Sequence, residues 1–199
     1  MQPNYSQLDP KFAARKENIS LYRKLTGNHS IPVNKQYWTL CNYQPIEDGS
    51  EIEQLVNAGL LKREQFYGVD RNEEIIRQNK IWHDDANWFA GEWLDVIKEC
   101  ESFNPSLVYL DTCSFADHHV ACDMTSRTMR LCPPETVLFV NVMGNDPRSK
   151  RQFDPQKLID NIRKTLTPTE RSRWKPNIKN YIYSATGRTY MYNCIFQRS

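Results

Sequence analysis

Short apolar runs alternate along the chain with segments whose apolar residues recur every three to four positions. The runs are typical of strands buried in a sheet, and they cover residues 37–41, 65–69, 87–90, 107–110 and 136–143. The segments between them have the period of amphipathic helices and cover residues 50–59, 72–82, 92–100, 116–131 and 153–166. Another helix is predicted over residues 9–26, where Pro10 suits the first turn and Gly27 ends the helix.

The alternation of strands and helices predicts a parallel sheet, because two parallel strands need a crossover connection. The chain ends differently: residues 181–184 and 190–196 flank Gly187 and suit an antiparallel hairpin. We therefore expect an α/β fold, a Rossmann-like three-layer sandwich whose mostly parallel seven-stranded sheet closes with a C-terminal antiparallel hairpin. No repeat or linker is visible, so residues 1–199 are expected to form a single domain with residues 1–34 as an N-terminal helical extension.

The composition excludes several classes of protein. Aromatic residues make up 12% of the chain, too many for a disordered polyelectrolyte. No stretch has the roughly 18 apolar residues of a membrane span, and the first residues lack the apolar segment of a secretion signal, so we expect no membrane association and a cytoplasmic location. The six cysteines have no metal-ligand spacing, so no metal is expected. The net charge of +2 is small, although basic residues gather in the first predicted helix and at 148–151.

Acidic residues directly follow three of the predicted strands. Ligands of open parallel sheets bind beyond the carboxyl ends of the strands, and Asp70, Glu92 and Asp111 occupy such positions. A carboxylate after the second strand can accept hydrogen bonds from both hydroxyls of a ribose, which makes Asp70 a candidate nucleoside ligand. The alternatives are structural: Asp70 could cap the helix that begins near Asn72, and Glu92 could be a helix-start acid.

Two of these segments resemble motifs of the class I S-adenosylmethionine-dependent methyltransferases. QFYGVDRNEEIIRQNK, residues 65–80, resembles their second motif, and FAGEWLDVI, residues 89–97, resembles their third. The resemblance covers about residues 35–199 and implies S-adenosylmethionine as the cofactor. It implies that Asp70 binds the ribose and Glu92 the adenine amino group, and that Arg71 and Trp93 also contact the cofactor.

The first motif departs from the family pattern. These enzymes normally have a glycine-rich loop after the first strand, so that the backbone passes close to the methionine part of the cofactor. This chain has WTLCNYQPIEDGSEIEQL, residues 38–55, with a single glycine. The helix start at Ser50 is expected to present free N–H groups to a carboxylate, and Glu47 or Glu51 to replace the usual acid. The residues expected to contact the cofactor here are Cys41, Asn42, Gly49 and Glu51.

LVYLDTCSF, residues 107–115, stands at the position of the family's fourth motif. In amino-methyltransferases of nucleic acids this motif reads Asp-Pro-Pro-Tyr and holds the target amine. The resemblance implies that Asp111 accepts from the amine and that Phe115 stacks on a base, although neither proline is present. Attack by Cys113 on a pyrimidine ring is the alternative for this segment.

Together these features predict an S-adenosylmethionine-dependent methyltransferase. Methyl transfer is a direct displacement, so positioning and charge placement suffice and no metal is needed. The basic segments favour nucleic acid as the acceptor. The alternative is a catalytically inactive methyltransferase-like module that binds nucleic acid or a protein partner, which the sparse glycines would suit.

Overall fold

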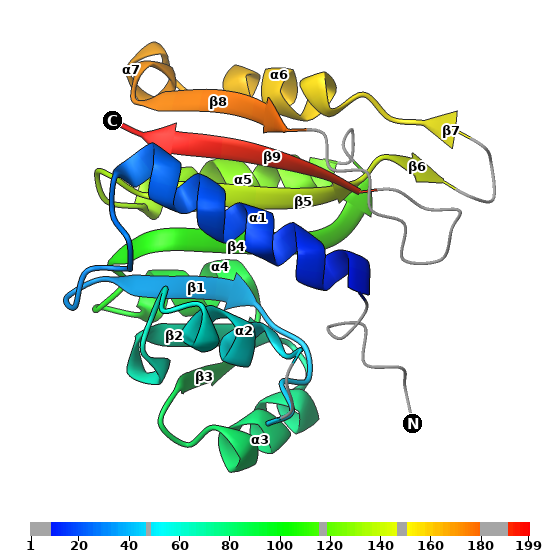
Figure 1. Cartoon of the computed structure of the whole chain (residues 1–199). Coiled ribbons are helices and arrows are strands. Elements are labelled where there is room, and N and C mark those ends of the chain that lie inside the picture. The colour runs from blue at the N-terminus through cyan, green and yellow to red at the C-terminus, as the bar shows by residue number, and fades with distance from the viewer. Residues whose placement is uncertain (1–8, 47–48, 116–118, 147–150, 180–190) are drawn as a thin grey trace. The chain divides into compact units, whose positions relative to one another are not determined.

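The strands form a mostly parallel sheet of seven in the order β3-β2-β1-β4-β5-β9-β8, and β6 and β7 form a separate pair. The computed structural model describes residues 9–46, 49–115, 119–146, 151–179 and 191–199 (Figure 1). The chain divides into two compact units, Met1–Leu107 and Val108–Ser199, and each is described in turn.

The first unit contains the beginning of the parallel sheet. Its helices are α1 (Asp9–Thr26), α2 (Glu51–Asn57), α3 (Glu73–Trp82) and α4 (Trp93–Glu99), and Arg63–Gln65 form a single 3₁₀ turn. Its strands are β1 (Gln36–Leu40), β2 (Phe66–Asp70) and β3 (Asn87–Ala90). The strand β1 pairs with β2, and β2 with β3, both in parallel, as the crossover rule requires (Figure 1).

Aromatic side chains fill the core of the first unit. The fully buried Trp38 ring lies 4.7 Å from the Tyr67 ring, 5.0 Å from Phe103 and 6.3 Å from Trp93, measured between centroids. Gly68 is required by this packing, because a Cβ atom there would lie 2.5 Å from the Trp88 ring. The buried rings therefore fix how closely β1, β2 and β3 can pack against their helices.

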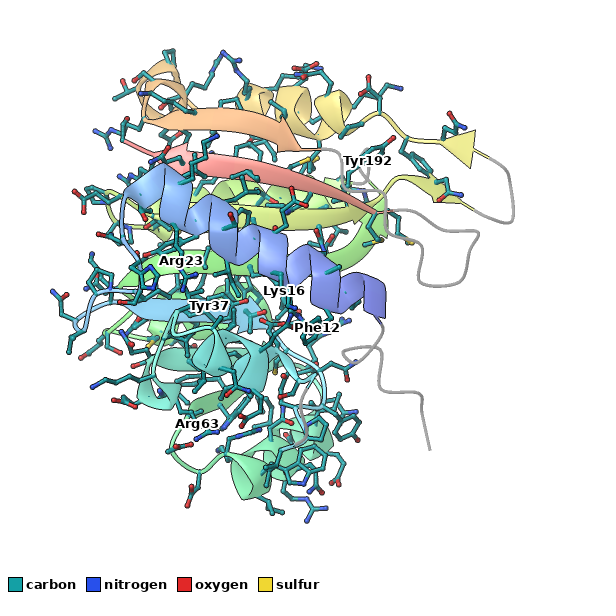
Figure 2. The ribbon with its side chains drawn as sticks, in the orientation of Figure 1. Phe12, Lys16, Arg23, Tyr37, Arg63 and Tyr192 are labelled. Atoms are coloured by element: carbon teal, nitrogen blue, oxygen red, sulfur yellow. The ribbon has the colours of Figure 1, made fainter. Side chains whose placement is uncertain are left out.

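The N-terminal helix α1 packs into the first unit. The hydroxyl of Tyr22 lies 2.6 Å from Ser106 Oγ, and the side-chain amide of Gln54 donates to the carbonyl of Phe12 at 2.8 Å. Within α1, Lys16 Nζ lies over the Phe12 ring, 4.7 Å from its centroid (Figure 2). None of the helices in the described part of the chain combines the length and apolar composition that a membrane crossing requires.

The second unit contains the antiparallel end of the sheet. Strand β4 (Pro105–Phe115) enters it from the first unit, followed by α5 (His119–Leu131), β5 (Val137–Met143) and the short strands β6 (Asn145–Asp146) and β7 (Arg151–Gln152). Helices α6 (Pro155–Thr165) and α7 (Pro168–Ser172) lead to β8 (Trp174–Lys179) and β9 (Met191–Arg198). Strand β9 lies between β5 and β8 and is antiparallel to both (Figure 1).

The predicted fold class is confirmed, with one correction to the elements. Strand β4 continues to Phe115, so Asp111 lies within a strand and does not end one. In addition, Trp174–Lys179 form a strand that the apolar pattern did not predict, antiparallel to β9. Both differences involve polar residues in strands, where backbone pairing does not depend on apolar side chains. The expected strand at residues 181–184 and the expected turn at Gly187 lie outside the described residues.

Candidate functional site

Asp70 and Glu92 lie at neighbouring strand ends in the first unit. Asp70 is the last residue of β2 and pairs in register with Ala90, the last residue of β3. The N–H of Gly91 donates to the Asp70 carbonyl at 3.0 Å, which holds the start of the β3–α4 connection against β2. Arg71 Nη1 lies 3.6 Å from Glu92 Oε1, so the side chains that follow the two strands meet. The structure therefore brings Asp70, Arg71 and Glu92 together.

Asp70 is placed to act as a hydrogen-bond acceptor. Its Oδ1 accepts from the N–H of Asn72 at 2.8 Å, and burial raises its pKa above the ordinary aspartate value, against the lowering effect of that hydrogen bond and of the Arg71 charge. Capping of α3 is done by Asn72, whose side chain accepts from the N–H of Glu74 at 3.0 Å. Among the described residues Asp70 forms no ion pair within 4 Å.

Glu92 and Trp93 have different environments. Glu92 is the N-cap residue of α4 but its side chain makes no capping hydrogen bond, and it is 62% exposed. Trp93 is buried and contacts Trp38 edge to face, so its ring belongs to the core. Gly91 between the strand and the helix has a φ of +149°, a backbone conformation that favours glycine. Glu92 thus faces solvent beside Arg71.

The loop after β1 is held by buried polar side chains. Cys41 is buried, and its N–H donates to the carbonyl of Val69 at 3.0 Å. Burial raises the pKa of the Cys41 thiol well above its ordinary value, and the negative charges of Asp70 and Glu51 add to the increase. The side-chain amide of Asn79, on α3, donates to the carbonyl of Asn42 at 2.9 Å. Cys41 is therefore a neutral, packed residue next to the Asp70 charge.

The amino end of α2 is closed by side chains of its own unit. Gln44 Oε1 accepts from the N–H of Glu51 at 2.7 Å and from the N–H of Ile52 at 3.4 Å. Ser50 Oγ accepts from the N–H of Glu53 at 3.3 Å. The expectation that these N–H groups are free is therefore wrong, because Gln44 from the divergent loop and the N-cap Ser50 already satisfy them.

Gln44 is itself fixed by two residues of the α3 region. Its N–H donates to Asn79 Oδ1 at 2.8 Å, and His83 Nε2–H donates to its carbonyl at 2.8 Å. All three side chains are buried, Gln44 to 1% exposure. No local sequence pattern predicts this network, because Asn79 and His83 lie 35 and 39 positions from Gln44. Asn79 alone has a local signature, since it follows Ile76 by three positions on the apolar face of α3.

Replacing Gln44 by alanine should destabilise the protein by about 1–3 kcal/mol, because the N–H groups of Glu51 and Ile52 lose their buried acceptor. The contacts of Asn79 and His83 use the backbone of residue 44 and survive the substitution. Urea denaturation measures the change, with Gln156→Ala on the exposed side of α6 as the control. Equal midpoints for the two variants would show that Gln44 does not hold the helix end.

Glu51 is enclosed rather than open to solvent. It is 4% exposed, Tyr37 Oη–H donates to its Oε1 at 2.5 Å, and Arg15 Nη2 lies 3.6 Å from its Oε2. Arg15 Nη1 also donates to the carbonyl of Gly49 at 3.3 Å, where the backbone has a φ of +123°. Arg15 comes from α1, so the N-terminal helix supplies the charge that balances Glu51.

The two residues predicted to face the acceptor belong to the second unit. Asp111 is half-buried in the middle of β4, and the neighbouring Thr112 hydroxyl donates to the carbonyl of Asn141 in β5 at 2.9 Å. Side chains of residues 113–118 lie outside the described part of the structure, which leaves Phe115 and the alternative nucleophile Cys113 as predictions.

Comparison with known proteins identifies the fold. Neither a protein-family model nor a curated protein matches the sequence. Among solved structures, Trm5b from Pyrococcus abyssi matches 94% of this chain with a TM-score of 0.58 and 12% identity. The match covers 48% of Trm5b, so the chain spans about half the length of that protein.

Two further structures match over almost their whole length. A TehB-like SAM-dependent methyltransferase from Corynebacterium glutamicum has a TM-score of 0.53 and 12% identity, over 94% of this chain and 96% of that protein. A candidate rRNA methylase from Clostridium thermocellum has a TM-score of 0.57 and 11% identity, over 90% and 94%. The chain therefore has the Rossmann-like fold of the class I S-adenosylmethionine-dependent methyltransferases.

Proposed function

We propose that the chain binds S-adenosylmethionine at the carboxyl ends of β2 and β3 and transfers its methyl group to a nucleic acid. The observation that carries this proposal is the adjacency of Asp70 and Glu92 at two neighbouring strand ends. Structural neighbours with the same fold include a protein named as SAM-dependent, which supports the choice of cofactor.

The residues at these strand ends fit the nucleoside part of the cofactor. Asp70 lies at the end of β2, where its carboxylate would accept from the two ribose hydroxyls. Glu92 is exposed with a side chain that caps nothing, so its carboxylate would accept from the adenine amino group. Arg71 Nη1 lies 3.6 Å from Glu92 Oε1 and would help to orient that carboxylate.

The first loop would have a different task from the glycine-rich loops of the family. Gln44 and Ser50 already satisfy the N–H groups of α2, so we propose that Cys41, Asn42 and Gly49 contribute backbone surface to the cofactor site. Glu51 would act through the fold, because Tyr37 and Arg15 hold its carboxylate.

When bound, S-adenosylmethionine would supply a methyl group on a positively charged sulfur. The acceptor nitrogen would take this group in a direct displacement that leaves the electron pair of the broken bond on sulfur, and the proton of the acceptor amine would pass to solvent. Asp111 would accept a hydrogen bond from the acceptor amine and Phe115 would stack on the base. Their contribution is orientation of the amine toward the methyl carbon.

Nucleic acid is the favoured acceptor for two reasons. One structural neighbour is described as a candidate rRNA methylase. In addition, α1 carries a group of basic side chains: Lys11, Arg15, Lys16, Arg23 and Lys24. Arg15 is turned into the first unit toward Glu51, and Arg23 donates to the carbonyls of His29 and Ala58, so the three lysines would provide the attraction for phosphate.

A second candidate function is favoured by the closed amino end of α2. Gln44 occupies the N–H groups that would otherwise receive an anionic ligand, and buried charges of Arg15 and Glu51 lock the same loop. Such an arrangement suits a methyltransferase-like module that no longer transfers methyl groups and instead binds a nucleic acid or protein.

Calorimetric titration with S-adenosylhomocysteine, adenosine and methionine separates the two candidates. The proposal predicts saturable one-to-one binding of S-adenosylhomocysteine. It also predicts weaker but measurable binding of adenosine, because Asp70 and Glu92 would both accept hydrogen bonds from the nucleoside part of the cofactor. Absence of heat with S-adenosylmethionine and S-adenosylhomocysteine up to millimolar concentration would reject the enzyme. A filter assay with tritiated S-adenosylmethionine then compares RNA, DNA and protein as acceptors.

A further inference from the structure

A pocket in the second unit is lined by three arginine side chains. Arg130 comes from the last turn of α5, Arg173 follows α7, and Arg198 is the last residue of β9. Glu170 and the buried Trp174 line the same space, and we call this set the arginine pocket. Figure 1 shows α7 and the start of β8 beside the end of β9, which is where the pocket lies.

The strand register places two of the arginines next to each other. Trp174 and Arg198 are direct partners in the antiparallel pair of β8 and β9, and Arg173 immediately precedes Trp174. The backbone N–H of Arg198 donates to the carbonyl of Thr136 at 2.9 Å, so the base of its side chain is fixed. The pairing of β8 with β9 therefore fixes the backbone positions of Arg173 and Arg198, so both arginines line the pocket as a consequence of the fold.

The charges of the pocket do not cancel. Arg130 Nε donates to Glu170 Oε1 at 3.1 Å, and its Nη2 donates to the carbonyl of Thr165 at 2.6 Å. Glu170 Oε2 accepts from the N–H of Thr167, and this hydrogen bond, with the Arg130 charge, lowers the pKa of Glu170. Arg130 and Glu170 thus satisfy each other, whereas Arg173 and Arg198 form no ion pair with any described residue.

One donor in the pocket is buried without an acceptor. The Nε atom of Arg198 is shielded from solvent and has no hydrogen-bond partner in the described part of the chain. A buried charged donor of this kind is unfavourable unless a ligand or ion completes it. A guanidinium offers Nε–H and Nη–H as a fork that matches two oxygens of one oxyanion.

We propose that the arginine pocket binds a phosphate group, with Arg198 contacting two of its oxygens and Arg173 a third. The cavity volume is about 60 Å³, far below the range of about 300–1,000 Å³ of pockets that enclose a drug-sized ligand. It therefore suits a single phosphate, either a free ion or one group of a polynucleotide backbone. The inference uses residues of the second unit alone and does not depend on the cofactor site.

The test is calorimetric titration with inorganic phosphate and with a short single-stranded RNA, each at constant ionic strength. An amino-terminal tag is needed, because the N–H of Ser199 donates to the Arg173 carbonyl close to the pocket. Wild type should bind phosphate one to one, and Arg173→Gln and Arg198→Gln should each weaken binding at least about tenfold. Arg163→Gln, an exposed arginine on α6 outside the pocket, is the matched control.

The two sources of phosphate give different results. If RNA is the source, the Arg173→Gln variant also binds RNA at least about tenfold more weakly and phosphate competes with RNA. If a free ion is the source, phosphate binding falls in this variant while RNA binding does not change. Saturable phosphate binding that is equal in wild type, Arg173→Gln and Arg163→Gln, or no binding at all, would overturn the proposal. Arg173 is exposed, so its variant tests the pocket even if Arg198→Gln fails to fold.

Discussion

Replacing Asp70 by asparagine should weaken the binding of S-adenosylhomocysteine by about tenfold, and replacing it by alanine by about a hundredfold. A hydrogen bond to a charged acceptor contributes roughly 1.5–3 kcal/mol, and the ribose offers two donors. Asparagine keeps the Oδ1 that accepts from the N–H of Asn72, so its effect reports the lost carboxylate and not a change in the fold. Calorimetry of both variants measures the loss, with Asp84→Ala, an exposed acid outside the site, as the control.

The pH dependence provides an independent check on the same residue. Burial raises the pKa of Asp70, so on acidification its carboxylate takes up a proton, and loses acceptor strength, at a higher pH than an ordinary aspartate would. The affinity of wild type for S-adenosylhomocysteine should therefore begin to fall at a higher pH than that of Asp70→Asn, which has lost the Asp70 carboxylate and keeps that of Glu92. If Asp70→Ala bound S-adenosylhomocysteine as tightly as wild type, Asp70 would not be a contact of the ribose.

Replacing Arg15 by leucine should lower the free energy of unfolding by about 3–5 kcal/mol, which corresponds to a Tm lower by roughly 6–20 °C. The side chains of Arg15 and Glu51 are 8% and 5% exposed, so the substitution leaves a carboxylate buried without its opposite charge. The hydrogen bonds of Arg15 to Gly49 and Gln54 are lost at the same time. Urea denaturation and calorimetry measure the effect.

Two further variants separate charge burial from general damage to a helix. Adding Glu51→Gln to Arg15→Leu should recover part of the stability, because glutamine removes the unpaired charge and still accepts from Tyr37. Arg77→Leu breaks the exposed pair with Glu74 and should leave Tm unchanged. A loss in Arg15→Leu no larger than that in Arg77→Leu would show that α1 does not stabilise the first unit through this pair.

Local patterns predict most of the helices and strands, because burial on one face imposes a period on the sequence. Strand β8 escaped prediction for a physical reason. It forms the edge of the sheet, where solvent faces one side and Pro176 can lack an N–H without breaking a ladder, so its sequence WKPNIK has no strand pattern. Asp111 likewise interrupts an apolar run without interrupting the strand.

Local patterns also predict only part of the candidate site. Asp70 and Glu92 could be predicted, since each directly follows an apolar run and strand ends meet at one edge of a parallel sheet. The network around Gln44 and the ion pair of Arg15 with Glu51 could not, because both depend on side chains brought together only by the tertiary fold. Long-range polar contacts leave no periodic trace in a sequence.

The position of Trp174 gives the second unit an optical reporter of its own. Four of the five tryptophans, Trp38, Trp82, Trp88 and Trp93, lie in the first unit, and Trp174 lies alone in the second, on the wall of the arginine pocket. Indole emission responds to the polarity and charge around the ring. The emission that is lost in a Trp174→Phe variant would therefore follow events at that wall alone. Comparing that signal with the remaining emission of the four buried and half-buried tryptophans would show whether the two halves of the molecule melt together.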